Sequence, residues 1–154
     1  MRGMTGLCHI SRLGALRLTL VVLMAVPLGA PGQAAQAAGQ NLPPLREVSK
    51  IDDGLLWVAL ADEIRKSCDD IEARMFNAVL FLGSLKRTAR DMGYSRAQVS
   101  AYLDSDEEKA RMRARGEAYL AAQGVSPDDK AGLCELGRAE IDRNSRIGTL
   151  LKAK

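Results

Sequence analysis

Neighbouring carboxylates are the first candidates for chemistry in this chain. Asp62 and Glu63 are adjacent, and two carboxylates can act as general acid and general base, as in glycan hydrolysis. They are followed closely by Arg65 and Lys66. Ion pairs on a helix surface explain this arrangement more simply, because opposite charges three or four positions apart pair there. A carboxylate-based envelope hydrolase is therefore kept only as a minor alternative.

A second acidic run, Asp104 to Glu108, superficially resembles a calcium-binding loop. In such a loop the sixth position would be Lys109 instead of glycine, and the twelfth would be Arg115 instead of glutamate. Ser105 followed three residues later by Glu108 is typical of a capping box at a helix N-terminus. The run therefore predicts the start of a helix, and we expect no metal site.

Cys68 and Cys134 are the candidates for a disulfide. Their spacing is far from C-x-x-C, so a thioredoxin-like redox role is not expected. In an oxidising compartment the two are expected to pair, and two buried free thiols are the alternative. A bond between them would close a long loop and stabilise the fold by roughly 4 kcal/mol in the loop-closure model.

The densest basic run has cations at alternate positions, namely Lys109, Arg111, Arg113 and Arg115. Alternate residues of a helix are turned by about 200°, so these cations divide between two faces. Glu107 and Glu117 are placed to pair with them four positions away. This pattern favours a solvated, salt-bridged helix over a nucleic-acid-binding stripe.

Residues 1–37 predict a cleaved signal peptide. An apolar run, Leu18–Ala30, contains Pro27 and precedes the A-x-A cleavage sequence Ala35-Gln36-Ala37. A cut after Ala34 is the alternative site. An uncleaved anchor is disfavoured because a bilayer span needs about 20 apolar residues. The positive region before the run is supplied by Arg2, Arg12 and Arg17. We therefore expect a periplasmic protein with no membrane span after cleavage.

Cleavage changes the charge and the chemistry of the chain. The whole chain has 22 basic and 19 acidic residues, and loss of the three signal arginines leaves the charges balanced. A chain with balanced charges has no excess of positive charge with which to attract nucleic acid or anionic lipid. Cys8 and His9 leave with the signal, and His9 is the only histidine. Catalysis by Ser–His or Cys–His and histidine-based metal binding are thus excluded. No glycine-rich phosphate loop is present, so we expect no cofactor and no enzyme.

The rest of the chain predicts one all-α domain of about five helices in a bundle-like arrangement. Residues 38–48 read as a flexible linker rich in Pro, Gln and Ala, and residues 49–154 as the helical domain. No run alternates with period two, so no strand is expected. The first predicted helix covers residues 52–66, and the second begins at residue 69 or 70 and ends at 92. The third begins after Ser95, which is its N-cap. The fourth runs from Ser105 toward Gly124, and the fifth begins at Ser126-Pro127.

The second of these helices is expected to form the backbone of the core. A continuous apolar stripe follows its helical period, and it comprises Ile71, Met75, Ala78, Val79, Leu82, Leu85, Ala89 and Met92. Gly93 is expected to end the helix as its C′ residue. Ser95 and Gln98 then form a capping box for the next helix.

The first helix has an unusual apolar surplus, since Leu55 to Ala61 reads LLWVALA without interruption. Either this helix lies centrally in the bundle, or its second face meets a partner. The candidate interaction residues are Leu55, Leu56, Trp57 and Arg74. A ligand pocket is an alternative use of the larger side chains, and it would be formed by Trp57, Phe76, Phe81, Tyr102 and Tyr119.

From Ile51 onward the chain resembles a family of small exported bacterial proteins known only as a domain of unknown function. The matching segments are Ile51–Leu55, Asp62–Cys68, Ala73–Met75, Gly93–Ser95, Glu108–Arg113, Cys134, Gly137–Arg138, Glu140–Ile141 and Ser145–Leu151. The resemblance implies no reaction. It implies that Cys68 and Cys134 are a paired feature of the domain. It also implies a genetic association with the proton-pumping respiratory NADH dehydrogenase, and hence an accessory subunit on its periplasmic face.

These observations together predict a non-catalytic periplasmic interaction protein. A protein partner is expected, and the resemblance points to a membrane-embedded respiratory complex. The alternative is a free periplasmic module that binds a small apolar ligand or an envelope component.

Overall fold

The computed structural model describes residues 42–154. The predicted signal peptide and cleavage site, together with residues 38–41 of the predicted linker, lie outside the described residues. The described part contains five α-helices and one small two-stranded sheet. The predicted all-α fold with about five helices is therefore confirmed.

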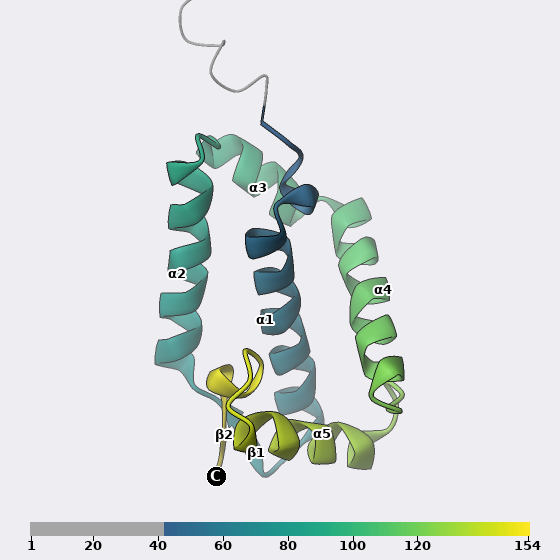
Figure 1. Cartoon of the computed structure of the whole chain (residues 1–154). Coiled ribbons are helices and arrows are strands. Elements are labelled where there is room, and N and C mark those ends of the chain that lie inside the picture. Colours follow the sequence, from purple (N-terminus) through teal and green to yellow (C-terminus); the bar gives the residue numbers. More distant parts are fainter. Residues whose placement is uncertain (1–41) are drawn as a thin grey trace, which may run out of the picture. The chain divides into compact units, whose positions relative to one another are not determined.

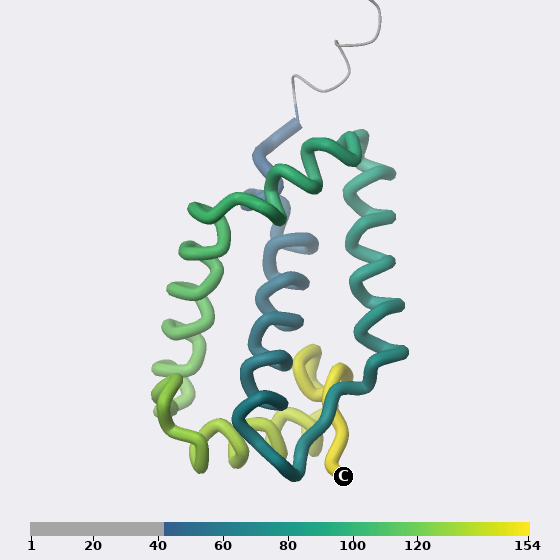
Figure 2. Tube along the Cα trace, turned by 180° about the vertical axis from the view of Figure 1, so that it is seen from behind, coloured from purple at the N-terminus to yellow at the C-terminus, as the bar shows by residue number. Residues whose placement is uncertain are grey.

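The long helix α1 (Ser49–Ser67) lies between two others in both views of the domain (Figures 1 and 2). Helix α2 (Met75–Asp91) runs antiparallel to α1 on one side, and α4 (Asp106–Ala122) flanks it on the other. The short helix α3 (Arg96–Asp104) joins the far end of α2 to the start of α4. Helix α5 (Lys130–Asp142) crosses the opposite end of α1.

The central position of α1 explains its apolar sequence. Leu56, Leu60, Ala61 and Ile64 are all buried, since α1 contacts α2, α4 and α5. Of the two explanations for the apolar surplus, the central helix is confirmed. The helix also begins at Ser49 rather than at Asp52 as predicted, because its first turn packs through the buried Ile51.

Two short strands were not predicted, and the second helix starts later than expected. Strand β1 (Ile71–Ala73) pairs antiparallel with β2 (Leu151–Ala153), so that Ile71 lies opposite Ala153. Helix α2 therefore begins at Met75 and not at Asp69 or Asp70. Strands of three residues are too short to display a period of two, and their partners are distant in sequence. The prediction of no strand was wrong for this reason.

The residues before α1 are more ordered than a flexible linker. Leu45 opens a 3-10 turn, η2 (Leu45–Glu47), and is only 6% exposed. The hydroxyl of Tyr94 donates a hydrogen bond to the carbonyl oxygen of Pro43. The predicted linker 38–48 thus needs correction over 42–48. There the chain packs on α1 and the α2–α3 turn, because Leu45 buries its side chain beside Tyr94.

Helix ends follow local rules in most places. Gly93 has a φ of +98°, which favours glycine, and it ends α2 as predicted. The predicted capping box of α3 is confirmed, since the Gln98 N–H donates to Ser95 Oγ over 3.2 Å and the Ser95 N–H donates to Gln98 Oε1 over 2.8 Å. Helix α5 differs, because its cap is Asp129, whose Oδ1 accepts from the Gly132 N–H at 2.9 Å, and not Ser126.

The main core lies where α1, α5 and the C-terminal segment meet. It contains Ile64, Leu133, Ile147 and Leu151, each at most 2% exposed. Gly137 of α5 allows this close approach, because a Cβ atom there would lie 2.6 Å from Ile64 Cγ2. The C-terminal segment consists of a 3-10 turn, η3 (Gly148–Leu150), followed by β2. No helix within residues 42–154 has the length and hydropathy needed to cross a membrane.

Candidate functional site

The surface of α2 that faces away from α1 carries exposed apolar side chains. Met75, Phe76, Val79 and Leu80 are 65%, 75%, 62% and 57% exposed. Their spacing places them on one face of the helix, because each residue turns by about 100°. The opposite face packs inward through the buried Leu85 and Ala89. We call these four residues the apolar half of the outer face of α2.

The remaining length of the same face is cationic. Lys86, Arg87 and Arg90 continue the angular positions of the four apolar residues along the last turns of α2, and all three are exposed. They form no ion pair with any other residue in the part of the chain that the structure describes. The outer face thus changes from apolar to positively charged along its axis.

This surface corrects the prediction that α2 is the backbone of the core. Of the predicted stripe within α2, Met75 and Val79 face solvent, and only Leu85 and Ala89 are buried. The first half of α2 is apolar nearly all round, so the period alone could not decide which side turns inward. Helix α1 occupies the centre instead.

The candidate interaction residues lie apart from this surface or at its edge. Leu56 is 4% exposed and belongs to the main core, whereas Leu55 and Trp57 are half-buried. Arg74 is exposed, and its backbone N–H donates to the Leu150 carbonyl at 2.8 Å, just before α2. The exposed apolar surface is therefore on α2 and not on α1, because α1 is covered by its neighbouring helices.

A buried ion cluster joins α1 to α3 and α4. The carboxylate of Asp52, only 3% exposed, accepts hydrogen bonds from Arg111, Arg115 and the hydroxyl of Tyr102. Burial alone would raise the pKa of Asp52, but the hydrogen bonds from Arg111 and Tyr102 outweigh it and hold the pKa below its ordinary value. Burial and the bond to Asp52 raise the pKa of Tyr102 to about 12.

Sequence reasoning described only part of this cluster. The predicted division of the basic run is seen, since Arg111 and Arg115 face α1 while Lys109 and Arg113 are exposed. The partners differ, however, because Arg111 pairs with Asp52 and with Glu108 at 2.8 Å instead of Glu107. The spacing of Arg111 and Arg115, four positions apart, indicated that both lie on one face of the helix. It could not indicate their shared partner, because Asp52 lies on another helix.

Glu108 also departs from its predicted role. The Ser105 side chain caps α4 by accepting from the Glu108 N–H at 3.3 Å. The Glu108 carboxylate binds Arg111 and Arg46 instead of completing a capping box. Asp106, in the same acidic run, pairs with Lys109 at 3.2 Å. The run contains a helix start, as predicted, and Asp106, Glu107 and Glu108 are engaged in ion pairs, whereas the Asp104 carboxylate accepts from Ser100 Oγ at 3.0 Å.

A second buried carboxylate, Glu140 of α5, organises the C-terminal segment. It is fully buried, and the hydroxyl of Tyr119 donates to its Oε1 at 2.6 Å. Arg143 and Ser145 also donate to it. Burial opposes ionisation, yet these hydrogen bonds lower the pKa of Glu140 below its ordinary value. Every contact of Glu140 is structural, and the sequence did not reveal this cluster.

The five aromatic side chains of the alternative ligand pocket do not gather around one space. Trp57 and Tyr119 contact each other edge to face, with ring centroids 5.8 Å apart. Phe76 is 75% exposed on α2, and the hydroxyl of Tyr102 binds Asp52. Phe81 packs against the main core together with Trp57 and Tyr119, whereas Tyr102 packs against the second buried cluster.

The two adjacent carboxylates of α1, Asp62 and Glu63, lie in different surroundings. Asp62 pairs with Arg65 and Lys66, and their hydrogen bonds outweigh burial and lower the pKa of Asp62. Glu63 is exposed and lines a groove between α1 and α4. The predicted helix-surface ion pairing is confirmed for Asp62.

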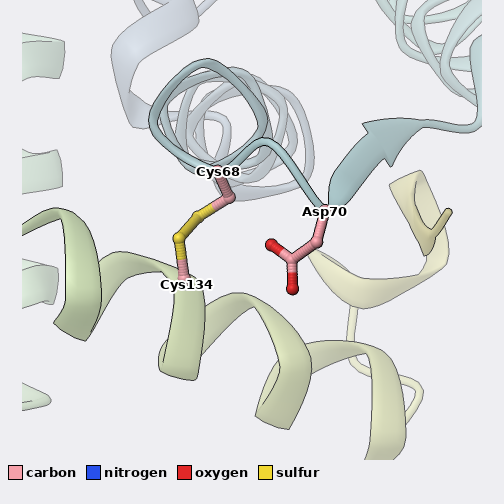
Figure 3. Close-up of side chains that lie close together, drawn as sticks. All are labelled: Cys68, Asp70 and Cys134. Carbon is pink, nitrogen blue, oxygen red and sulfur yellow. A yellow bond between two sulfur atoms is a disulfide. The ribbon is translucent and has the colours of Figure 1, made fainter.

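Cys68 and Cys134 form a disulfide between the end of α1 and α5, with Cα atoms 5.4 Å apart (Figure 3). Within residues 42–154 they are also grouped with Asp70 as possible metal ligands, with ligand atoms within 4.8 Å of one another. Metals bind cysteine as the free thiolate, which a disulfide does not provide. Asp70 in addition pairs with Arg138 at 2.9 Å. Cys68 and Cys134 therefore act as a structural cross-link, and Asp70 lies beside it in an ion pair.

Comparison with known proteins agrees with the resemblance noted in the sequence. The family described as "Family of unknown function (DUF5333)" matches residues 43–152. The chain belongs to this family. The match covers all the helices and both clusters of buried charge. No curated protein and no solved structure matches the chain significantly.

Proposed function

We propose that this DUF5333 protein is a non-catalytic interaction protein of the periplasm that docks on a protein partner through the apolar half of the outer face of α2. The observation that carries the proposal is the exposure of Met75, Phe76, Val79 and Leu80, each more than half exposed on one helix face. Grouped apolar side chains of this kind mark interaction surfaces.

The position of these residues strengthens the argument. They follow directly after β1, which the C-terminal strand holds in place, and the Asn77 side chain donates to the Thr149 carbonyl at 3.0 Å. The start of α2 is therefore fixed to the core by its inward side. A partner would bind a pre-ordered helix face and would pay little conformational entropy for ordering it.

The buried charges support a structural role for the rest of the domain. Asp52 and Glu140 are both saturated by arginine and hydroxyl donors from within the chain. Such groups stabilise the arrangement of helices that presents α2, and they offer no free acid or base.

The compartment and the partner are the finer part of the proposal. The export signal predicted from the sequence and the Cys68–Cys134 disulfide both favour the periplasm. The partner we propose is a respiratory membrane complex of the NADH dehydrogenase type, on its periplasmic face. This choice rests on the resemblance of the sequence to its family.

Affinity capture with matched variants tests the proposal. The tagged wild-type protein, the Phe76→Gln/Leu80→Gln variant and the control Met92→Gln are each recovered from gently solubilised envelopes. Met92 is 39% exposed but lies beyond the patch at the end of α2. Burial of each large apolar side chain contributes about 1.5–3 kcal/mol. We therefore expect a stoichiometric complex with the wild type and the control, and its loss with the double variant.

Two results would separate the parts of the proposal. Equal recovery of the same subunits by all three proteins would refute docking through α2. Recovery of a defined complex that depends on Phe76 and Leu80 but contains no respiratory subunit would refute only the proposed partner. A wild-type protein that stays monomeric and alone would refute both.

A further inference from the structure

We propose that the cleft between α2 and α3 binds a monomeric single-chain anionic amphiphile, such as a fatty acid. Its alkyl tail would enter an apolar pocket, and its carboxylate would meet a cationic groove beside that pocket. This site uses a different part of α2 from the proposed docking surface, and the inference does not depend on that function.

The pocket lies where residues of α1, α2 and α3 meet. Figure 1 shows α3 at this end of the domain, between the end of α2 and the start of α4. Its volume is about 180 Å³, which is below the roughly 300–1,000 Å³ of sites that enclose drug-sized ligands. A narrow, flexible tail matches this volume better than a bulky ring system. The side chains that form its walls include Leu55, Leu82, Leu85, Ala89, Val99 and Leu103.

The walls offer almost nothing to a polar occupant. Lys86 and Tyr102 are the lining residues with polar groups. Lys86 is also a wall of the adjoining groove, and the hydroxyl of Tyr102 already donates to Asp52 and accepts from Arg111 at 2.9 Å. A peptide segment would bring amide groups into this pocket without partners, which is costly. An alkyl chain has no polar atoms and leaves no such group unsatisfied.

The adjoining groove supplies the opposite chemistry. It has a volume of about 520 Å³ and shares Val99, Leu103 and Lys86 with the pocket, so the two spaces adjoin each other. Its remaining charged walls are Arg87 and Arg90 of α2 and Arg96 of α3. All the charged side chains of the groove are thus cationic.

These cations have no anionic partner among residues 42–154. Asp91 is the acidic residue beside Arg90 in sequence, and it forms no ion pair with any of them. Unopposed like charges around one groove attract an anion. Guanidinium groups also match a carboxylate through two parallel hydrogen bonds. A ligand that joins an anionic head to an apolar tail would use both spaces at once.

Calorimetric titration of the purified protein with defined probes tests the inference. The probes are dodecanoate below its micellar concentration, dodecyltrimethylammonium as the cationic counterpart with the same alkyl tail, and phosphatidylglycerol vesicles. We expect saturable one-to-one binding of dodecanoate and at least about tenfold weaker binding of the cationic probe. The dodecanoate affinity should also fall as salt is added.

Variants assign the binding to the cleft. Arg87→Glu/Arg90→Glu changes two exposed cations of the groove, and Arg113→Glu/Lys130→Glu makes the same change of charge at exposed positions on α4 and α5. We expect about a tenfold or larger loss of dodecanoate affinity for the first pair and little change for the second. Leu103→Trp, at a 38% exposed position, should weaken dodecanoate binding by filling the pocket.

Three results would overturn the inference. The first is equal binding of the anionic and the cationic probes. The second is dodecanoate binding that is unaffected by Arg87→Glu/Arg90→Glu. The third is binding to vesicles without binding to monomeric dodecanoate, which would make the cations a lipid-surface contact. The charge variants remain decisive even if Leu103→Trp fails to fold, because they alter only exposed side chains.

Discussion

Asp52 of α1 and Arg111 of α4 are 59 positions apart in the chain, and Arg111 Nη1 donates a hydrogen bond to Asp52 Oδ2 over 3.1 Å. The same carboxylate binds Arg115 one turn further along α4 and Tyr102 of α3. One buried charge therefore connects three helices. Its partners enclose it so completely that it is only 3% exposed, and breaking this cluster should loosen α4 from α1.

Substitution of Arg111 by methionine tests this connection. The variant keeps most of the aliphatic volume of Arg111 but removes its bonds to Asp52 and Glu108. Arg115 remains as a partner of Asp52. We expect the free energy of unfolding to fall by about 2 kcal/mol, the range for a hydrogen bond to a charged group. Arg113→Met, at an exposed position of the same helix, should change it by about 0.5 kcal/mol or less. Equal effects in urea unfolding would contradict the structural role.

Acid should destabilise the protein through its buried carboxylates. In the folded state the pKa values of Asp52 and Glu140 lie below their ordinary values of 3.8 and 4.5. Their stabilising contribution is therefore complete above those ordinary values and is lost as the pH falls through the lower folded-state pKa values. We expect the thermal midpoint to fall steeply below about pH 4. Glu140→Gln should be less stable at neutral pH and should show a shallower fall. An identical slope in the variant would rule out this contribution.

Loss of the disulfide should cost more stability than most single substitutions. The bond joins positions separated by 66 in sequence, and the loop-closure model assigns a loop of this length about 4 kcal/mol. We expect Cys68→Ala, Cys134→Ala and the double variant to unfold at similarly reduced urea concentrations, because each removes the same bond. Additive losses in the double variant, or wild-type stability in either single variant, would show that the two cysteines act independently.

Two helical glycines should respond in opposite directions to alanine. A Cβ atom at Gly137 would lie 2.6 Å from both Ile64 Cγ2 and Ile71 Cδ1, so Gly137→Ala should destabilise by about 1–3 kcal/mol through overpacking. A Cβ atom at Gly83 would meet nothing within 4 Å. Gly83→Ala should therefore stabilise by about 0.5–1 kcal/mol, since glycine is unfavourable inside a helix. Thermal unfolding of the two variants measures both effects, and destabilisation by Gly83→Ala would indicate that its surroundings are not open.

Several features of this protein were determined by the sequence itself. The end of α2 at Gly93 and the Ser95–Gln98 capping box depend on residues within one or two turns of each other. Local chemistry is enough for such features, since their hydrogen bonds join near neighbours in the chain. The helical class of the domain was predictable for the same reason. The pairing of Cys68 with Cys134 was expected from the compartment and from the family resemblance, and the structure contains it.

Other features were decided only when the helices packed together. The pairing of β1 with β2 joins Ile71 to Ala153 across nearly the whole domain. The burial of Asp52 needs arginines from a helix that follows much later in the chain.

The orientation of α2 is the clearest case, because it leaves Phe76 exposed and buries Leu85. Its first half is apolar on several sides, and burial is a property of the whole assembly of helices. Periodicity could show that α2 has an apolar stripe, but only the central position of α1 determined which side of α2 faces inward and which side faces the solvent.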